Sequence, residues 1–250
     1  MSLGIVRGMK EEFVLRKSLV LAAIFSGVLA TSLSAATIPL WSTGICSGAN
    51  VILANCSAGA GSALNFGVPD ANYVFSGPGV NTTNLTVHAV GGSPGYVPDA
   101  AGASEWLEPG NLAGALFPSG AYTVTSTFNL SGFDPTTLSL FLDIAADNDV
   151  VAALNGTTIL SCGTVTGTPS SGNLCFSAFT SNHSISAGGI ALPGLNTLTY
   201  TVYNENDPSL TALRVQVQGN ASLAAVPEPG TLVLLSAGLA GLGLLRRKRA

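Results

Sequence analysis

The sequence predicts an all-β protein in which a single β-sandwich is flanked by an apolar segment at each end. The first observation is an alternation of apolar and polar residues over several central segments, which is typical of half-buried strands. The second is composition, since the central region is rich in Gly, Ser, Thr, Asn and Val and shows no sustained helical period. The third is charge, because nearly all basic residues lie at the two ends.

The first 36 residues have the organisation of a secretory signal peptide. Their apolar run of about 12 residues, from Leu19 to Ala30, is too short to span a membrane permanently. Small residues follow at Ser34, Ala35 and Ala36, and we place signal-peptidase cleavage after Ala36. We therefore expect the rest of the chain to be exported. The basic residues that precede the run are Arg7, Lys10, Arg16 and Lys17.

Residues 37–222 form the predicted sandwich domain, a length that one all-β sandwich routinely fills. Arg214 is the only basic residue in this domain, which contains no lysine. An acidic domain is a poor partner for nucleic acids, and the absence of lysine excludes Schiff-base catalysis and a Walker-type phosphate loop. Its carboxylates are Asp70, Asp99, Glu105, Glu108, Asp134, Asp143, Asp147, Asp149, Glu205 and Asp207.

The strand pattern is clearest in the second half of the domain. From Tyr122 to Leu130, apolar residues alternate with threonines and an asparagine, which predicts a strand with one polar face. A turn follows at residues 131–135. From Leu138 to Ala146, every second residue is apolar, so one face of a second strand should be buried.

A β-hairpin is predicted next. Residues 150–154 run into Asn155-Gly156, a strong type I′ turn sequence, and residues 157–160 would return as the partner strand. The alternation reappears over residues 197–202 and 213–218, which predicts two closing strands around a loop at residues 204–208.

Four cysteines fall into two sequence-local pairs, Cys46 with Cys56 and Cys162 with Cys175. Neither spacing is that of a zinc site, and the two histidines, His88 and His183, do not complete a ligand set. In an exported chain we expect these two pairs to be disulfides, although four cysteines allow two other connectivities. We predict no metal site and no cofactor.

The residues that suggest chemistry are few. Gly91 to Gly95 match a nucleophile-elbow pattern, but Pro94 follows the serine and lacks the backbone N–H that an oxyanion hole needs. Asp147 and Asp149 would share one face of an extended strand. They are compatible with a solvated turn, with Ca²⁺ binding or with a pair of glycosidase carboxylates.

Glu105 and Glu108 flank Trp106. This arrangement is compatible with a sugar ring stacked on the indole or with a tryptophan that anchors the core, and we favour the core role. We expect His88 and His183 to be ordinary strand or loop residues. No catalytic residues are therefore assigned.

The last residues consist of a turn, an apolar stretch and a basic end. Two prolines keep Pro227-Glu228-Pro229 extended, and the helix can begin only after Gly230. Residues 231–245 carry no charge and would form about 22 Å of helix, which is short for a permanent membrane span. The basic end, which should stay on the cytoplasmic side, is Arg246, Arg247, Lys248 and Arg249.

This tripartite tail, residues 223–250, resembles the PEP-CTERM sorting signal of Gram-negative bacteria. The resemblance implies that a membrane-embedded exosortase recognises Pro227, Glu228 and Pro229 and cleaves nearby. It further implies export across the inner membrane, contact with the membrane through the C-terminal helix during sorting, and a final location at the cell surface or outside the cell. Signal peptidase and exosortase are the expected processing partners.

The sandwich domain resembles the galactose-binding-like jelly rolls that sorted bacterial surface proteins often carry. The resemblance covers most of residues 38–222, and it consists of turn and core residues, so it implies a fold more than a ligand. The segments that carry it are 40–44, 69–73, 103–109, 122–135, 145–148, 154–156, 194–198 and 213–215.

Together these features predict a non-enzymatic binding or structural module of the envelope or exopolysaccharide, with an extracellular polysaccharide as its expected partner. The alternatives are an exported polysaccharide hydrolase and a purely structural matrix protein.

Overall fold

The computed structural model describes residues 34–47, 56, 61–80, 84–87, 96–98, 103–109, 115–162, 175, 183–224 and 236–239. The chain divides into two compact units, Met1–Ser34 and Ala35–Ala250, and every described strand belongs to the second. In the first half of that unit the strands are β1 (Ala35–Thr37), β2 (Pro69–Ser76), β3 (Asn84–Val87), β4 (Leu107–Pro109) and β5 (Gly120–Asn129). The short 3-10 helix η3 (Pro135–Thr137) follows. The later strands are β6 (Ser139–Asp147), β7 (Asp149–Leu154), β8 (Thr157–Cys162), β9 (His183–Ser186), β10 (Leu195–Asn204) and β11 (Ala212–Ser222).

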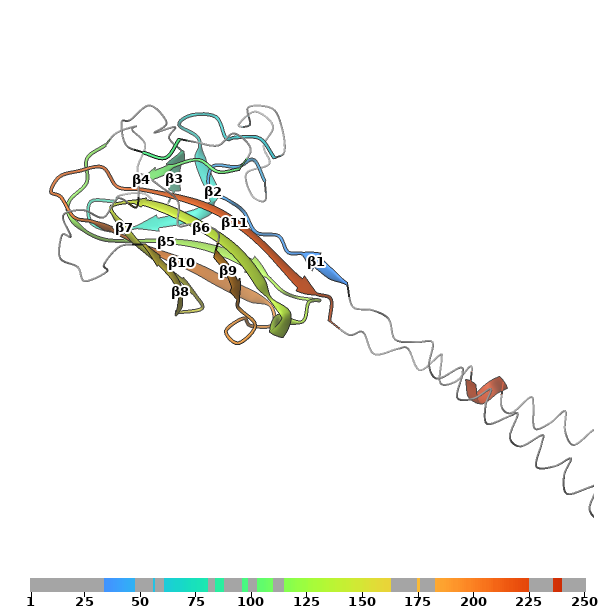
Figure 1. The fold of residues 1–250 in the computed structure, drawn as a ribbon. Coiled ribbons are helices and arrows are strands. Elements are labelled where there is room, and N and C mark those ends of the chain that lie inside the picture. The colour runs from blue at the N-terminus through green and yellow to red at the C-terminus, as the bar shows by residue number, and fades with distance from the viewer. Residues whose placement is uncertain are drawn as a thin grey trace, which may run out of the picture. The chain divides into compact units, whose positions relative to one another are not determined.

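The strands form a β-sandwich, as predicted (Figure 1). One sheet has the order β8-β7-β10-β5-β2 and is called here the β10 sheet. The other has the order β3-β4-β11-β6-β9 and is called the β11 sheet, with β1 paired to β11 in addition. All these pairs are antiparallel, and the β2–β3 pair joins the two sheets at one side. The inner faces of both sheets build one hydrophobic core.

The alternating patterns place the core as predicted. On β5, Tyr122, Val124 and Phe128 are buried, whereas the threonines between them lie on the outer face. On β6, Leu140, Leu142 and Ile144 face the core. The outer face of β6 is also largely buried, which the sequence pattern did not predict.

The β7–β8 hairpin is confirmed, because residues 150–154 pair with residues 157–162 across a two-residue turn. Asn155 and Gly156 both have positive φ, 49° and 84°, which is the conformation that a type I′ turn requires. The asparagine side chain also fastens the turn to the sandwich. Its Nδ2 donates to the carbonyl of Ile190 and to Oδ1 of Asn196, at 2.9 and 2.8 Å.

The two closing strands lie in different sheets. β10 pairs with β5 and β7, whereas β11 pairs with β6 and β4, so residues 205–211 cross from one sheet to the other. Asn204 holds this crossing in place, because its Nδ2 donates to the carbonyl of Phe117 at 3.0 Å. Phe117 in turn exchanges two backbone hydrogen bonds with Ser209.

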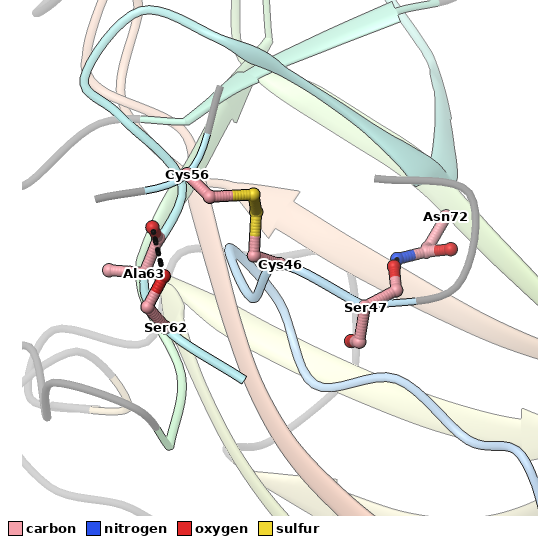
Figure 2. The surroundings of a disulfide bond; sticks show 6 residues. All are labelled: Cys46, Ser47, Cys56, Ser62, Ala63 and Asn72. Carbon is pink, nitrogen blue, oxygen red and sulfur yellow. Dashed lines mark hydrogen bonds between the residues drawn. A yellow bond between two sulfur atoms is a disulfide. The ribbon is translucent and has the colours of Figure 1, made fainter. Parts of the chain in front are cut away.

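Both predicted disulfides are confirmed. Cys46 is bonded to Cys56 and Cys162 to Cys175, with Cα–Cα distances of 5.7 and 5.9 Å. Figure 2 shows the first bond beside Asn72, whose Nδ2 donates to the carbonyl of Ser47 at 2.9 Å. The described residues contain no free cysteine. The disulfide and this hydrogen bond attach the segment around Cys46 to the rest of the domain.

Candidate functional site

The two ends of the sandwich domain lie side by side. In the antiparallel β1–β11 pair, Ala35 is opposite Ser222 and Thr37 is opposite Asn220 (Figure 1). The start of β1 and the end of β11 therefore meet at one end of the sandwich. This end is called here the tail end.

The folded domain continues to Ala224. The backbone N–H of Ala224 donates to the carbonyl of Gly132 at 2.9 Å, and Leu223 forms a β-bridge with Phe133. Only two residues, 225 and 226, separate Ala224, where this described part of the chain ends, from Pro227. The predicted recognition turn therefore follows directly on the folded domain.

The sorting residues at 227–229 and 246–249 lie outside the described residues. Within the predicted helix, only residues 236–239 are described, and they are helical. Among the residues that the structure describes, no helix has the length and apolar character to cross a membrane.

The predicted signal-peptidase site falls within a strand, because Ala35 and Ala36 belong to β1 and pair with Ser222 and Ala221. The domain boundary at residue 37 remains a prediction. Cleavage after Ala36 would leave Thr37 as the only residue of β1.

The outer face of the β11 sheet carries a fully buried arginine. Leu213 and Val215 face the main core, so Arg214 between them points to the opposite side. Its Nε donates to Ser104 Oγ at 2.9 Å, and its Nη1 donates to the carbonyls of Val97 and Pro98. These bonds hold the segment 96–98 against β11.

Trp106 and Tyr96 complete a second small core on this face, together with Ala145 and Ala212. The two aromatic rings meet edge to face with centroids 5.1 Å apart, and the indole Nε1 donates to the carbonyl of Val97 at 2.9 Å. Trp106 is fully buried, so the predicted core role is confirmed. The alternative of a sugar-stacking platform is wrong, because the indole has no exposed surface.

Asp147 accepts a hydrogen bond from the Tyr96 hydroxyl on the same face. Burial raises the pKa of Asp147, and the nearby charge of Glu205 raises it further, while the bond from Tyr96 acts in the opposite direction. Burial and the Asp147 charge also raise the pKa of Tyr96 well above its usual value. The tyrosine therefore remains a hydrogen-bond donor across the physiological range.

The expectation that Asp147 and Asp149 share one face of an extended strand is wrong. Asp147 ends β6 opposite Ala212, whereas Asp149 begins β7 opposite Tyr203 in the other sheet. Both are buried, at 8% and 2% exposure, so the solvated-turn alternative is also wrong. The chain changes sheet between them, which the sequence pattern did not indicate.

The other predicted residues are placed as follows. Glu108 is buried in β4, whereas Glu105 is half-buried just before that strand. His183 begins β9 opposite Leu142, and His88 and the segment 91–95 lie outside the described residues. Within the described part of the chain, no three His, Cys, Asp or Glu side chains gather closely enough to hold a metal ion.

Sequence reasoning missed two buried charged residues that organise loops. The sequence identifies Arg214 only as the lone arginine of a domain without lysine, and that isolation is itself a signal of a specific role. The second is Asp70, which is 1% exposed. Its carboxylate accepts backbone N–H bonds from Gly44 and Asn72, at 2.8 and 2.9 Å. No local pattern distinguished it from a surface aspartate.

The outer face of the β10 sheet has a different character. Three threonines of β5 lie directly opposite three threonines of β10. All six side chains are at least partly exposed, and the outward residues of these two strands are uncharged. The pairs are Thr123 with Thr201, Thr125 with Thr199, and Thr127 with Thr197. This group of six is called here the threonine face.

The fold is that of a β-sandwich, and the segment predicted to carry the sorting signal follows a few residues after its last described strand. The chain carries a PEP-CTERM protein-sorting motif, since the family model of that motif matches residues 225–249. This motif indicates an exosortase-targeted protein that is exported in bacteria and sorted through a membrane-anchored stage. The comparison with curated proteins finds no match.

Three solved structures resemble the chain weakly. A Stig cyclase from Fischerella sp. TAU is 11% identical at a TM-score of 0.39, over 77% of this chain and 100% of that one. An arabinose-bound α-L-arabinofuranosidase is 13% identical at 0.33, over 62% and 24%. A family 35 carbohydrate binding module from an environmental isolate is 12% identical at 0.26, over 64% and 97%. All three TM-scores are too low to support a conclusion about this chain. The assignment of the fold as a β-sandwich therefore depends on the strand order and register described above.

Proposed function

We propose that this exosortase-targeted protein is a non-enzymatic binding or structural module of the cell surface or extracellular matrix, associated with envelope polysaccharide or exopolysaccharide. Signal peptidase would remove the leader as the chain crosses the inner membrane of a Gram-negative bacterium. The exosortase would then act at the Pro227-Glu228-Pro229 turn. The observation that carries the proposal is the matched motif at residues 225–249, which begins directly after Ala224, a residue still hydrogen bonded to the β-sandwich.

The threonine face supports a polysaccharide partner. Its hydroxyls repeat about 6.7 Å apart along each strand and about 4.8 Å apart between the strands. A neutral surface with regularly spaced hydroxyl donors and acceptors suits a ligand that is itself neutral, repetitive and rich in hydroxyl groups.

The buried polar residues support a non-enzymatic role. Arg214 donates hydrogen bonds to Ser104 Oγ and to the carbonyl of Pro98. Asp147 accepts a hydrogen bond from the Tyr96 hydroxyl, so both charged residues bind loop residues of the domain itself. These contacts fix the fold of the outer loop segment. Groups committed to holding a loop are poorly placed to take part in hydrolysis of an external substrate.

The sorting step is tested by the intact mass of the protein from the envelope and medium of its native host. We expect the wild type to have lost residues at both ends. Replacement of Pro227-Glu228-Pro229 by three alanines should leave the tail in place, whereas Asn206→Ala in an exposed loop should be processed normally. A wild-type protein that retains residues 231–250 in the membrane would contradict the proposal.

The polysaccharide partner is tested by co-sedimentation with exopolysaccharide isolated from the same host. A Thr125→Lys/Thr199→Lys variant should pellet severalfold less than the wild type, because it places two charges on the threonine face. Gln218→Lys on the β11 sheet is the matched control and should pellet normally. Equal pelleting of both variants would remove the assignment to this face. Release of new reducing ends by the wild type would instead indicate a hydrolase.

A further inference from the structure

The tail end carries three exposed leucines. Leu192 lies in the β9–β10 loop and is 51% exposed, and Leu195 is the first residue of β10 and is 65% exposed. Leu223 directly follows β11 and is 48% exposed. Residues 129–133 connect them. Leu195 is opposite Asn129 in the β5–β10 pair, the N–H of residue 130 donates to the carbonyl of Gly194 at 2.8 Å, and Leu223 bridges to Phe133. The three leucines therefore belong to one end of the sandwich.

Charge is distributed unequally between the two ends. Among the described residues of the sandwich, the tail end has Asp134 as its only carboxylate. Four carboxylates lie at the opposite end of β11, about 30 Å away for a strand of this length: Asp147, Asp149, Glu205 and Asp207. Asp147 and Asp149 are buried, so Glu205 and Asp207 are the carboxylates that reach the surface at that end, and anionic lipid headgroups would repel them. The tail end instead offers leucines and little charge.

The link to the sorting helix is short. The domain is hydrogen bonded to residue 224, and the apolar stretch begins at Thr231. Even fully extended, this link spans at most about 25 Å, and the headgroup layer of a bilayer takes up roughly 6 Å of it. While the tail is in the membrane, the tail end is therefore confined near the lipid surface at a high effective concentration.

We propose that the tail end, with Leu192, Leu195 and Leu223, docks on the lipid surface and sets the orientation of the domain before processing. The inference rests on the proposed function, because it requires the tail to be inserted in a membrane. Three leucines provide weak affinity on their own, but a short tether makes weak affinity sufficient. Once the tail is cut, the tether is lost and the domain leaves the lipid.

The test uses the full chain reconstituted in vesicles of phosphatidylethanolamine and phosphatidylglycerol, with a quencher attached to the lipid headgroups. The native cysteines form disulfides, so an added thiol can be labelled selectively. A fluorophore at Ser131→Cys reports on the tail end, and one at Asn206→Cys reports on the opposite end. Carbonate extraction of the same vesicles reports whether the tail is inserted.

We expect the probe at residue 131 to be strongly quenched and the probe at residue 206 to be quenched little. The combined change Leu192→Ser/Leu195→Ser/Leu223→Ser should lower the docked-to-free ratio at least about tenfold. Leu116→Ser, an exposed leucine beside the Phe117–Ser209 bridge at the opposite end, is the matched control and should change nothing.

Two outcomes are separated by this design. If carbonate extracts the full chain, the membrane stage itself fails, and the docking inference fails with it. If the tail resists extraction but quenching at residue 131 is the same in the wild type and the triple-serine variant, the sorting proposal stands. In that case docking through the leucines is wrong, and the tether alone holds the domain near the membrane.

Discussion

The outer faces of the two sheets differ, although the strands that form them have similar alternating sequences. On the β10 sheet, the threonines of β5 and β10 face outward without charge. On the β11 sheet, the segment 96–98 covers the equivalent side, and Arg214 and Trp106 are fully buried beneath it. A period-two pattern therefore identifies which residues share a face of a strand, but it does not identify what covers that face.

The largest effect should come from Arg214→Ala. The change leaves Ser104 Oγ and the carbonyls of Val97 and Pro98 without the donors they use now, and it opens a cavity. We expect a loss of about 3–5 kcal/mol in the free energy of unfolding, measured by chemical denaturation. Arg214→Met retains most of the buried volume and should cost less. If Arg214→Ala were as mild as a surface substitution, the hydrogen bonds from Arg214 to Ser104, Val97 and Pro98 would contribute no stability.

A smaller effect is expected for Trp106→Phe. Phenylalanine preserves most of the aromatic packing against Tyr96 but removes the indole bond to the carbonyl of Val97. The expected loss is about 1–3 kcal/mol in the free energy of unfolding. Hydrogen exchange should become faster in the segment 96–98 and remain unchanged in β5. Faster exchange in both regions would show that the two faces unfold together.

The pH dependence of stability should separate two carboxylates. Burial raises the pKa of Asp147 above its ordinary value of 3.8, so the folded protein binds that proton more tightly than the unfolded chain. This carboxyl therefore favours folding at low pH, and its contribution falls as the pH rises from 3.8 through the raised pKa. Asp147→Asn can still accept the Tyr96 bond, so it should flatten this slope and be more stable than the wild type at neutral pH.

Asp134 is the matched control for that measurement. Its hydrogen bonds from Thr136 lower the pKa of the carboxyl, so its contribution is present above the unfolded value and is lost as the pH falls. Asp134→Asn should therefore change the pH slope in the opposite direction to Asp147→Asn. If both substitutions changed the pH slope of the free energy of unfolding in the same direction relative to the wild type, the assigned causes of the two pKa shifts would be wrong.

The smallest effect should come from the threonine face. Thr125→Val and Thr199→Val replace facing residues whose side chains reach solvent. We expect the free energy of unfolding to change by no more than about 0.5 kcal/mol, because valine has a similar shape and strand preference. A loss as large as that of Trp106→Phe would show that this face is covered in the folded protein.

Local chemistry made much of this fold predictable from the sequence. The strands around Tyr122 and Leu140 follow from alternation, the hairpin follows from Asn155-Gly156, and the disulfide partners are close in sequence. The sorting motif is equally local, since the prolines, the apolar stretch and the basic end are contiguous. Each of these features is contained in a short stretch of the chain, and the longest of them, the sorting motif, spans residues 225–249.

Long-range placement was decided by the tertiary structure alone. The sequence gives no local reason for Arg214 to meet Ser104, for Asp147 and Asp149 to enter opposite sheets, or for Ala35 to lie beside Ser222. Such contacts join segments separated by up to nearly the whole domain, and they depend on strand order rather than on the pattern within a strand. Local patterns thus account for the central strands, the hairpin, the favoured cysteine pairs and the sorting tail. Which polar residues are buried and which end carries the tail depend on the pairing of the strands, because that pairing joins residues far apart in the chain.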